Sequence, residues 1–561
     1  MSTPITDSLA IAVAQLNPVV GDLKGNSAKA VAAREEAARL GADLVVFPEL
    51  FVTGYPPEDL VMKPAFIAAA HGELLQLAQA TADGGPAMLI GATWPGNNGG
   101  KPYNACALLD EGAVQGVRYK VDLPNYGVFD EKRVFEPGPM PGPLNFRGVR
   151  IGAPICEDIW TDAVCECLAE TGAEMLIVPN GSPFTLTKRD IRMNQAVARV
   201  AETGLPLLYV NQVGGQDELV FDGASFALNP GGALAMQLPA WEEAVRLVRL
   251  RRTGDGWRFE PGEKALVEEG EEAAYRACVL GLRDYVTKNG FKGVLLGLSG
   301  GIDSALCAAM AADALGPGAV HCIMLPYRYT SNASLSDAAA CAEALGVRYD
   351  IVPIHAPMDG FEAALGLLFK GMPPDITEEN LQSRTRGALL MAVSNKFGSM
   401  LVTTGNKSEV SVGYATLYGD MNGGFNPIKD LYKMQVYALA RLRNRKRPAG
   451  CLGPEGVVIP ESIITRAPTA ELRENQTDQD SLPPYEALDD ILACLVDREM
   501  PLADIVARGH AAETVKKVER LLYLAEYKRR QSAPGVKITD RNFGRDRRYP
   551  ITNRFREHID A

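Results

Sequence analysis

The stretch from Val294 to Ser304 constrains the fold of this chain more than any other part of the sequence. It reads Val-Leu-Leu-Gly-Leu-Ser-Gly-Gly-Ile-Asp-Ser, so an apolar strand ending at Leu298 leads into a turn of small residues. Residues 305–315 then have the apolar spacing of a helix. A helix N-terminus offers backbone N–H groups and partial positive charge, and glycines let a phosphate approach closely. The stretch therefore predicts a phosphate-binding loop between a strand and a helix.

The side chains of this loop add to the prediction. Ser299 and Ser304 supply hydroxyl donors, whereas the carboxylate of Asp303 cannot itself hold a phosphate. The common nucleotide loop has a lysine before its last Ser or Thr, and this chain has Asp303 in that place. We expect Asp303 to bind a Mg²⁺ ion that bridges the phosphates. The string 299–304 resembles the pyrophosphate loop of enzymes that cleave ATP between its α and β phosphates and leave an adenylated substrate.

Length and charge limit the remaining possibilities. A chain of 561 residues is too long for one ordinary core, and typical sizes suggest about two to four domains. The net charge of −12 argues against nucleic acid as a partner, which would need clustered Lys and Arg. No apolar run is long enough to cross a membrane, and no export signal is evident, so we expect a cytoplasmic protein. The ten cysteines are widely spread, which predicts reduced thiols rather than disulfides.

The first half contains one phrase used twice. Residues 41–49, Gly-Ala-Asp-Leu-Val-Val-Phe-Pro-Glu, give a turn, a buried strand and a carboxylate at the end of the strand. Residues 172–180, Gly-Ala-Glu-Met-Leu-Ile-Val-Pro-Asn, repeat this pattern, again after a helical stretch. The repetition predicts a layered α/β domain with two similar halves, ending near residue 255.

Three residues in this domain follow apolar segments, where site chemistry gathers in α/β folds. Glu49 closes a strand, Lys120 follows another, and Cys156 follows the segment 151–155, which we expect to be a strand. A thiolate nucleophile needs a base for its proton, a nearby cation and a donor for the oxyanion. Glu49 is the candidate base, Lys120 the candidate oxyanion donor and Cys156 the candidate nucleophile. Taken alone, each has a simpler explanation as a solvated or core residue, and spacing does not bring the three together.

A family resemblance joins them. Phe47–Pro48–Glu49, Lys120 with Leu123–Pro124, and Cys156–Glu157–Asp158 are similar to the motifs of the nitrilase family over residues 8–250. That family has an αββα sandwich and hydrolyses amides or nitriles with a Glu-Lys-Cys triad. The resemblance further implies that Glu131 steadies the lysine and that glutamine is bound by Tyr126, Ser182 and Lys188.

The second half alternates strands and helices. We expect strands at 320–325, 348–353 and 400–404, which with the strand before the phosphate loop predict a doubly wound parallel sheet. A ligand would then lie at the carboxyl ends of the strands. Glu409 follows the last of these strands and could share a Mg²⁺ ion with Asp303, or could simply cap a helix.

Several segments of this half carry a closer resemblance. The loop at 299–304, residues 379–387, 403–409, 418–420 and 526–531 together resemble NAD synthetase, in a sheet of the adenine nucleotide α-hydrolase type. Joined to the nitrilase-like half, they resemble the glutamine-dependent form of that enzyme over nearly the whole chain. The resemblance implies that ATP is bound by Gly297, Leu298, Ser299, Gly300, Gly301, Ile302, Asp303, Ser304 and Thr404, and deamido-NAD by Asn380, Glu409 and Lys528. A further lysine that reaches phosphate corresponds to Lys429 or Lys433.

The resulting scheme has a glutaminase domain at 1–255, a linker at 256–272 and an NAD synthetase domain at 273–561. Ammonia from glutamine would attack an adenylated pyridine carboxylate, giving NAD, AMP, pyrophosphate and glutamate. Because ammonia is mostly protonated in water near neutral pH and ammonium is not a nucleophile, we expect a protein passage between the domains. The resemblance also implies a homo-oligomer. Residues 460–484, rich in Pro and polar residues, fit either a mobile lid or a surface loop. The alternatives are the same two domains acting on another acceptor, and a nucleotide sensor without turnover.

Overall fold

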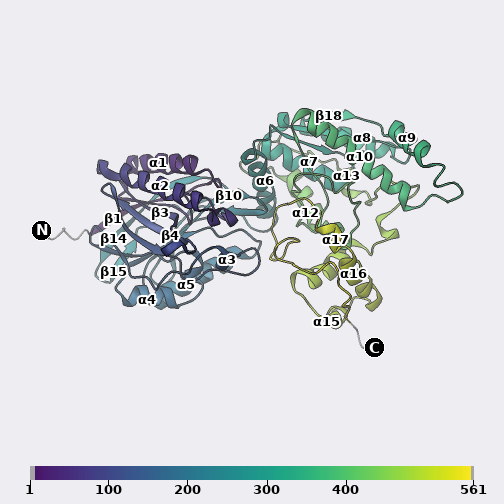
Figure 1. The fold of residues 1–561 in the computed structure, drawn as a ribbon. Helices are drawn as coiled ribbons and strands as arrows, with labels where there is room; N and C mark the ends of the chain where they lie inside the picture. Colours follow the sequence, from purple (N-terminus) through teal and green to yellow (C-terminus); the bar gives the residue numbers. More distant parts are fainter. Residues whose placement is uncertain (1–6, 558–561) are drawn as a thin grey trace. The chain divides into compact units, whose positions relative to one another are not determined.

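The computed structural model describes residues 7–557 and divides into two compact units (Figure 1). Unit 1 runs to Glu268, apart from the short segment 217–219, which groups with unit 2. Unit 2 begins at Glu269. No helix in the part of the chain that the structure describes is long and apolar enough to cross a membrane. Each of the ten cysteines has a free thiol, as the sequence predicts.

Unit 1 contains two large sheets. The first has the strand order β15-β14-β1-β2-β3-β4-β5, formed by Gly256–Phe259, Ala244–Thr253, Ser8–Gln15, Leu44–Val46, Ala87–Trp94, Tyr103–Asp110 and Ala113–Tyr119. The second has the order β13-β12-β9-β8-β7-β6, formed by Ala233–Gln237, Phe226–Asn229, Leu207–Asn211, Met175–Asn180, Val149–Gly152 and Leu144–Phe146. The two repeated phrases of the sequence supply β2 and β8, one for each sheet.

These sheets form the middle of a four-layer sandwich. One core cluster joins the facing sides of the two sheets, with Ile11 and Val46 from the first and Ile177 and Val210 from the second. A second cluster packs helices α1 (Leu23–Arg39) and α2 (Pro64–Ala80) on the outer face of the first sheet. A third packs α4 (Ala163–Glu170) and α5 (Lys188–Thr203) on the outer face of the second (Figure 1). This is the αββα order that the sequence predicts.

The segment assigned to a linker differs from the prediction. Residues 256–259 form β15, which pairs antiparallel with β14 at the edge of the first sheet. Its buried residues, Trp257 and Phe259, alternate with exposed Gly256 and Arg258. This alternation is that of a half-buried strand, but charged and glycine neighbours mask it over so short a length. The segment that connects the two units is therefore shorter than 256–272.

Unit 2 is built on a parallel sheet. The order is β18-β17-β16-β19, formed by Arg348–Ile351, Val320–Met324, Val294–Gly297 and Met400–Leu401, and every neighbouring pair is parallel. Helix α7 (Ile302–Leu315) follows β16, and α10 (Ile376–Phe397) packs on the sheet through Leu389 and Leu390. The chain turns to opposite sides of β16 to form β17 and β19, so the carboxyl ends of β16 and β19 mark the switch point where ligands bind in such sheets.

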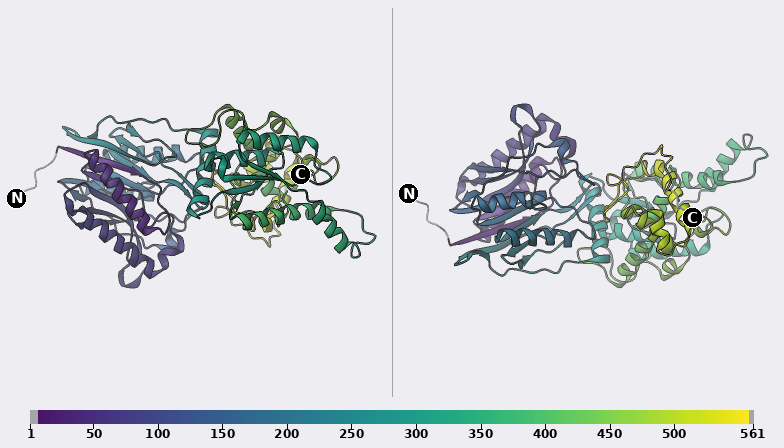
Figure 2. Two further views of the ribbon diagram at one scale, coloured as in Figure 1. Left: turned by 90° about the horizontal axis from the view of Figure 1, so that it is seen from above. Right: turned by 90° about the horizontal axis from the view of Figure 1, so that it is seen from below.

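Other helices surround this sheet. They are α6 (Gly270–Lys288), α8 (Asn332–Leu345), α9 (His355–Leu365), α11 (Lys407–Val412), α12 (Lys433–Arg445), α13 (Glu461–Thr465), α14 (Tyr485–Leu492), α15 (Leu502–Ala507), α16 (Ala512–Leu524) and α17 (Glu526–Arg529). Helix α9 and the start of α10 extend from the body of unit 2, in green (Figure 2). Helices α14 to α16 enclose a separate small core that includes Leu488, Leu502 and Val518.

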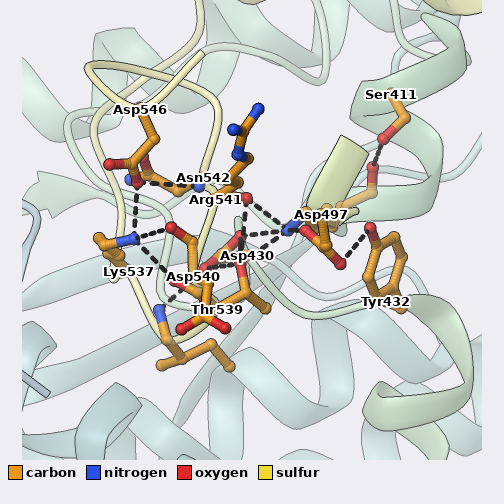
Figure 3. A network of polar contacts seen from close by, with 12 residues as sticks. Ser411, Asp430, Tyr432, Asp497, Lys537, Thr539, Asp540, Arg541, Asn542 and Asp546 are labelled. Carbon is orange, nitrogen blue, oxygen red and sulfur yellow. Dashed lines mark hydrogen bonds and ion pairs between the residues drawn. The ribbon is translucent and has the colours of Figure 1, made fainter. Parts of the chain in front are cut away.

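A buried ammonium group ties the C-terminal segment to this body. The Nζ of Lys407, on a side chain with no exposure, lies 2.9 Å from carboxylate oxygens of both Asp430 and Asp497. It also donates to Thr539 Oγ1 at 2.7 Å. Asp430 in turn accepts from the backbone N–H groups of Ile538 and Thr539 at 2.8 and 2.7 Å, within the network of Figure 3. The charge of Lys407 therefore holds the segment around Thr539 against α11.

We predict that Lys407→Met lowers the free energy of unfolding of unit 2 by about 3–5 kcal/mol, because it leaves buried carboxylates without their cation. Urea unfolding of the full-length variant, followed by circular dichroism, measures the change. Lys516→Met is the control, since that side chain is 44% exposed and pairs loosely with Glu513 at 3.8 Å. Equal unfolding midpoints for the two variants would contradict the role of Lys407.

Candidate active sites

The first site is centred on a buried lysine. Lys120 lies directly after β5 and has no exposed surface. Its Nζ donates to Glu49 Oε1 at 2.7 Å and to both carboxylate oxygens of Glu131 at 3.0 Å. Burial alone would lower the pKa of Lys120, but the charges of Glu131 and Glu49 outweigh it and raise that pKa well above its ordinary value. The lysine is therefore a permanent cation between two carboxylates.

Cys156 lies on a sharp turn beside this lysine. The strand before it, β7, ends at Gly152, so the expected strand at 151–155 is shorter, and Cys156 begins a 3₁₀ turn instead. Its φ is +48°, an unusual value for a residue with a side chain and one that clusters at functional sites. Burial, and then the charge of Glu49, raise the pKa of the thiol, while Lys120 opposes them. The thiol therefore needs a base to become a nucleophile.

Asp158 joins the cysteine turn to the lysine. One carboxylate oxygen accepts from the backbone N–H groups of Val121 and Asp122 at 2.9 and 2.8 Å. The other accepts from the N–H of Ile155 at 2.9 Å. These bonds hold the residues that follow Lys120 next to the residue that precedes Cys156. Asp158 belongs to the Cys156–Glu157–Asp158 motif, but its role could not be predicted from the sequence.

The three residues expected to bind glutamine lie around the same turn. Tyr126 OH donates to Glu157 Oε1 at 2.9 Å, and Lys188 Nζ lies 4.0 Å from the centre of the Trp160 ring. Burial raises the pKa of Glu157, while Lys120, the hydrogen bond from Tyr126 and the charge of Lys188 lower it. Both Tyr126 and Lys188 are therefore close to the residue after the cysteine. Ser182 follows Gly181, whose N–H donates to Glu49 Oε2 at 2.9 Å.

The second site is a cavity of about 470 Å³ in unit 2. All of the expected ATP and deamido-NAD residues line it: Gly297, Leu298, Ser299, Gly300, Gly301, Ile302, Asp303, Ser304, Asn380, Thr404, Glu409 and Lys528. They come from segments far apart in the sequence, and the strand ends of the parallel sheet bring them to one place. Of the two candidate lysines, Lys433 also lines the cavity, and Lys429 is not among its lining residues.

The loop before α7 has the geometry of an anion site. Its hydroxyls bond within the loop, with Ser299 Oγ and Ser304 Oγ 3.1 Å apart and the N–H of Gly301 donating to Ser299 Oγ at 3.3 Å. Gly300 has a φ of +82°, and a Cβ there would lie 2.4 Å from the carbonyl oxygen of Ser334. Only glycine fits this conformation and this close approach. The start of α7 therefore presents its backbone N–H groups and positive dipole end to the cavity.

Two carboxylates in this cavity share one lysine. Lys433 Nζ donates to Asp303 Oδ2 at 2.6 Å and to Glu409 Oε1 at 3.1 Å. Asn406 orients both, because its Nδ2 donates to Asp303 Oδ1 at 2.8 Å and its Oδ1 accepts from the N–H of Glu409 at 3.0 Å. Burial raises the pKa of Glu409 to about 7, with Lys433 opposing and Asp303 adding to the rise. Asp303 and Glu409 together thus have less positive charge near them than two ionised carboxylates require.

The donor set fits Mg²⁺. Carboxylate oxygens are ligands that this ion prefers, and it commonly combines one or two carboxylates with substrate phosphates and water. No cluster of three or more His, Cys, Asp or Glu that could hold a metal occurs within residues 7–557. Asp303 and Glu409 would hold Mg²⁺ together with phosphate oxygens and water, which is consistent with a site beside a phosphate loop.

Other polar side chains line the part of the cavity wall away from the phosphate loop. Asn380 Oδ1 accepts from Thr416 Oγ1 at 3.1 Å, and Lys528 Nζ donates to the carbonyl oxygens of Gly413 and Ala415 at 2.8 and 2.7 Å. Burial lowers the pKa of Lys528. Arg386, which no pattern in the sequence singles out, also lines the cavity. Because burial removes its guanidinium from water, the pKa of Arg386 is lowered to about 10.

Segment 460–484 forms part of this wall. Arg466, Glu471 and Asp478 are among its residues that line the cavity. Glu471 Oε1 accepts from Ser334 Oγ at 2.9 Å, and Asp478 accepts from the hydroxyls of Tyr414 and Tyr485 at 3.1 and 2.8 Å. The segment is therefore more than a surface loop, since it closes one side of the cavity through specific contacts.

Both halves of the chain are similar in sequence to known proteins. The family model described as carbon-nitrogen hydrolase matches residues 10–258, and the one described as NAD synthase matches residues 274–532. A glutamine-dependent NAD(+) synthetase of Rhodobacter capsulatus is 54% identical, over 99% of this chain and 100% of the relative. One of Xanthomonas campestris pv. campestris (strain 8004) is 46% identical, over 97% of this chain and 98% of the relative. This chain belongs to the glutamine-dependent NAD(+) synthetase family.

A solved structure agrees with this membership. The glutamine-dependent NAD+ synthetase of Acinetobacter baumannii, solved in complex with adenosine diphosphate, is 42% identical with a TM-score of 0.77, covering 97% of this chain and 99% of that one. As a member of the family, the chain is a ligase that amidates deamido-NAD with ATP and nitrogen from glutamine. The family and the fold class predicted from the sequence are confirmed.

We predict that Gly300→Ala lowers kcat/KM for NAD synthesis from ammonia by about 100-fold, because a displacement of the phosphate loop by about 1 Å is enough for such a loss. The added Cβ would meet the Ser334 carbonyl oxygen at 2.4 Å. Gly318→Ala is the control, since nothing lies within 4 Å of a Cβ at that position. Steady-state kinetics with ATP varied would test this, and equal kcat/KM values for the two variants would contradict it.

Proposed function

We propose that unit 1 releases ammonia from glutamine and that unit 2 uses it to convert adenylated deamido-NAD to NAD. The observation that carries the proposal is that one chain holds both a Cys156 thiol beside Glu49 and Lys120 and a phosphate loop beside the carboxylates of Asp303 and Glu409. The thiol with its carboxylate and lysine suits amide hydrolysis, and the phosphate loop with its carboxylates suits activation of an acid by ATP. Together they account for a nitrogen donor and an ATP-activated acceptor in one protein.

In the first site, Glu49 accepts the proton of the Cys156 thiol as the sulfur attacks the glutamine side-chain carbonyl. The buried Lys120 ammonium donates to the oxyanion of the tetrahedral intermediate, where its charge acts with little solvent screening. Glu49 then returns this proton to the amide nitrogen as the intermediate collapses, which releases ammonia and leaves a thioester that water hydrolyses to glutamate. Tyr126, Ser182 and Lys188 bind the glutamine, and Lys188 suits its α-carboxylate.

In the second site, residues 297–304 and Thr404 bind ATP, while Asn380, Glu409 and Lys528 bind deamido-NAD. The pyridine carboxylate attacks the α-phosphate, pyrophosphate leaves, and ammonia then displaces AMP from the adenylate. Lys433 stabilises the charge on the phosphates. Asp303 and Glu409 hold Mg²⁺, which supplies charge neutralisation at the phosphates when it is bound. We assign segment 460–484 the role of a lid over the adenylate.

Ammonia must remain unprotonated to act as a nucleophile. Because an amine of its basicity is mostly protonated near neutral pH in bulk water, we propose that it reaches the second site through a protected passage. A homo-oligomer and a cytoplasmic location complete the proposal. We do not favour another acceptor for the ammonia, because membership of the family points to deamido-NAD.

We predict that Cys156→Ala abolishes glutamine-dependent NAD formation and leaves ammonia-dependent formation within about twofold of the unmodified protein, because free ammonia bypasses the nucleophile. Measuring NAD with glutamine or an ammonium salt as donor tests this. Loss of synthesis from both donors in a folded variant would contradict the assignment of the two sites.

We also predict that Asp303→Ala lowers synthesis from both nitrogen donors by about 100-fold or more, because it removes a ligand of the metal that neutralises the phosphates. Glutamine hydrolysis by unit 1 serves as the check that the variant is folded. Full ammonia-dependent synthesis by Asp303→Ala would rule out that role.

A further inference from the structure

Asn104 lies between the two carboxylates of the first site, although no motif or family match singles it out. It is the second residue of β4 and is 1% exposed. Its Nδ2 donates to Glu49 Oε1 at 2.7 Å and, in a longer bond, to Glu131 Oε2 at 3.5 Å. Its backbone carbonyl accepts from the N–H of Lys120 at 2.8 Å. Asn104 thus bonds to both carboxylates and to the backbone of the lysine that they share; we call Glu49, Lys120 and Glu131 the hub.

The orientation of this amide is determined by the carboxylates. Ionised carboxylates only accept hydrogen bonds, so the NH₂ group of Asn104 must face Glu49 and Glu131. Its Oδ1 is then buried without a hydrogen-bond partner among the residues that the structure describes. Buried polar atoms are nearly always paired, so an unpaired one needs an explanation. A role in packing does not supply one, since an apolar side chain of the same size would pack without leaving a polar atom unpaired.

We propose that Asn104 is a positioning residue for glutamine hydrolysis, holding Glu49 in the orientation and the ionised form that accept the thiol proton of Cys156. The inference rests on the proposed function of the first site. It assigns Asn104 a role through Glu49 rather than contact with glutamine.

The charge balance of the hub explains why a neutral donor is needed. Lys120 is one cation shared by two carboxylates, so the hub carries an excess of negative charge. The charged and titratable groups around Glu49 are Lys120, Glu131, Cys156, Glu157 and Tyr55, whose hydroxyl donates to Glu131 Oε1 at 2.8 Å. Hydrogen bonds to a charged carboxylate favour that form without adding a charge. Removing the Asn104 donor therefore favours a protonated carboxyl, which cannot serve as the base.

Two variants of Asn104 test the inference. Asn104→Leu keeps the branched shape and removes the donor, and Asn104→Asp keeps the shape but replaces the NH₂ donor with a third carboxyl group beside Glu49 and Glu131. For both we expect kcat of glutamine hydrolysis to fall roughly 10–100-fold, a typical range for impaired general-base catalysis. We also expect the acid limb of kcat/KM against pH to move to higher pH for Asn104→Leu, with KM changed less than kcat. Ammonia-dependent synthesis should stay at the level of the unmodified protein.

Thr93→Val is the matched control. Thr93 pairs with Asn104 across β3 and β4, and its buried Oγ1 also lacks a hydrogen-bond partner among the described residues. We expect this variant to keep both kcat and the pH profile. If Asn104→Leu has a lowered melting temperature, the isosteric Asn104→Asp decides the matter.

The outcomes separate this inference from the proposed function. Unchanged kcat in both Asn104 variants, or a lower kcat for Asn104→Leu with an unshifted acid limb, would overturn the positioning role while the triad assignment stands. Glutamine hydrolysis that survives Cys156→Ala would instead overturn the proposed function itself.

Discussion

A lysine buried between two carboxylates is the interaction on which both sites depend, and within residues 7–557 it occurs three times. Lys120 lies between Glu49 and Glu131, Lys433 between Asp303 and Glu409, and Lys407 between Asp430 and Asp497. The lysine side chains are 0%, 2% and 0% exposed, so each ammonium is almost completely removed from water. Such a cation is tolerated only when close anions and hydrogen bonds compensate for lost solvation, and its position is therefore sharply determined.

The same physics gives the three lysines different roles. Lys120 lies beside a thiol and Lys433 in a cavity beside a phosphate loop, which are the places where the proposed reactions would develop negative charge. Lys407 instead bonds to Thr539 and packs over the ring of Tyr432, which makes it part of the frame. Since Lys407 begins the helix that carries Glu409, this frame also supports the carboxylate that faces the cavity.

Local sequence patterns predict those structural elements that are determined by residues close together in the chain. The phosphate loop and the strand–helix alternation of unit 2 follow from the apolar runs and small residues between 294 and 404. The charged edge strand β15 was predicted as a linker, because its alternation is too short to stand out. Glu49, Lys120 and Cys156 could be joined only through resemblance to a family, since no local pattern links residues that far apart in the chain.

Two features of the sites could not be predicted from the sequence, because they depend on contacts between residues far apart in the chain. The choice between Lys429 and Lys433 depends on a contact across 130 positions, from Lys433 to Asp303. Asn104 lies 55 positions from Glu49, and an asparagine before an apolar strand is most simply a turn residue. In both cases the tertiary structure brings the two residues together, and the charges around them explain the contact.

The central claim is that one chain couples glutamine hydrolysis to the ATP-driven amidation of an acid. The most direct test is the stoichiometry of NAD, AMP and pyrophosphate formed from deamido-NAD and magnesium ATP, with glutamine or an ammonium salt as donor. The account predicts equal amounts of the three products with either donor, and one glutamate for each NAD when glutamine is used at full coupling. Absence of NAD with both donors, or release of ADP and phosphate in place of AMP and pyrophosphate, would contradict it.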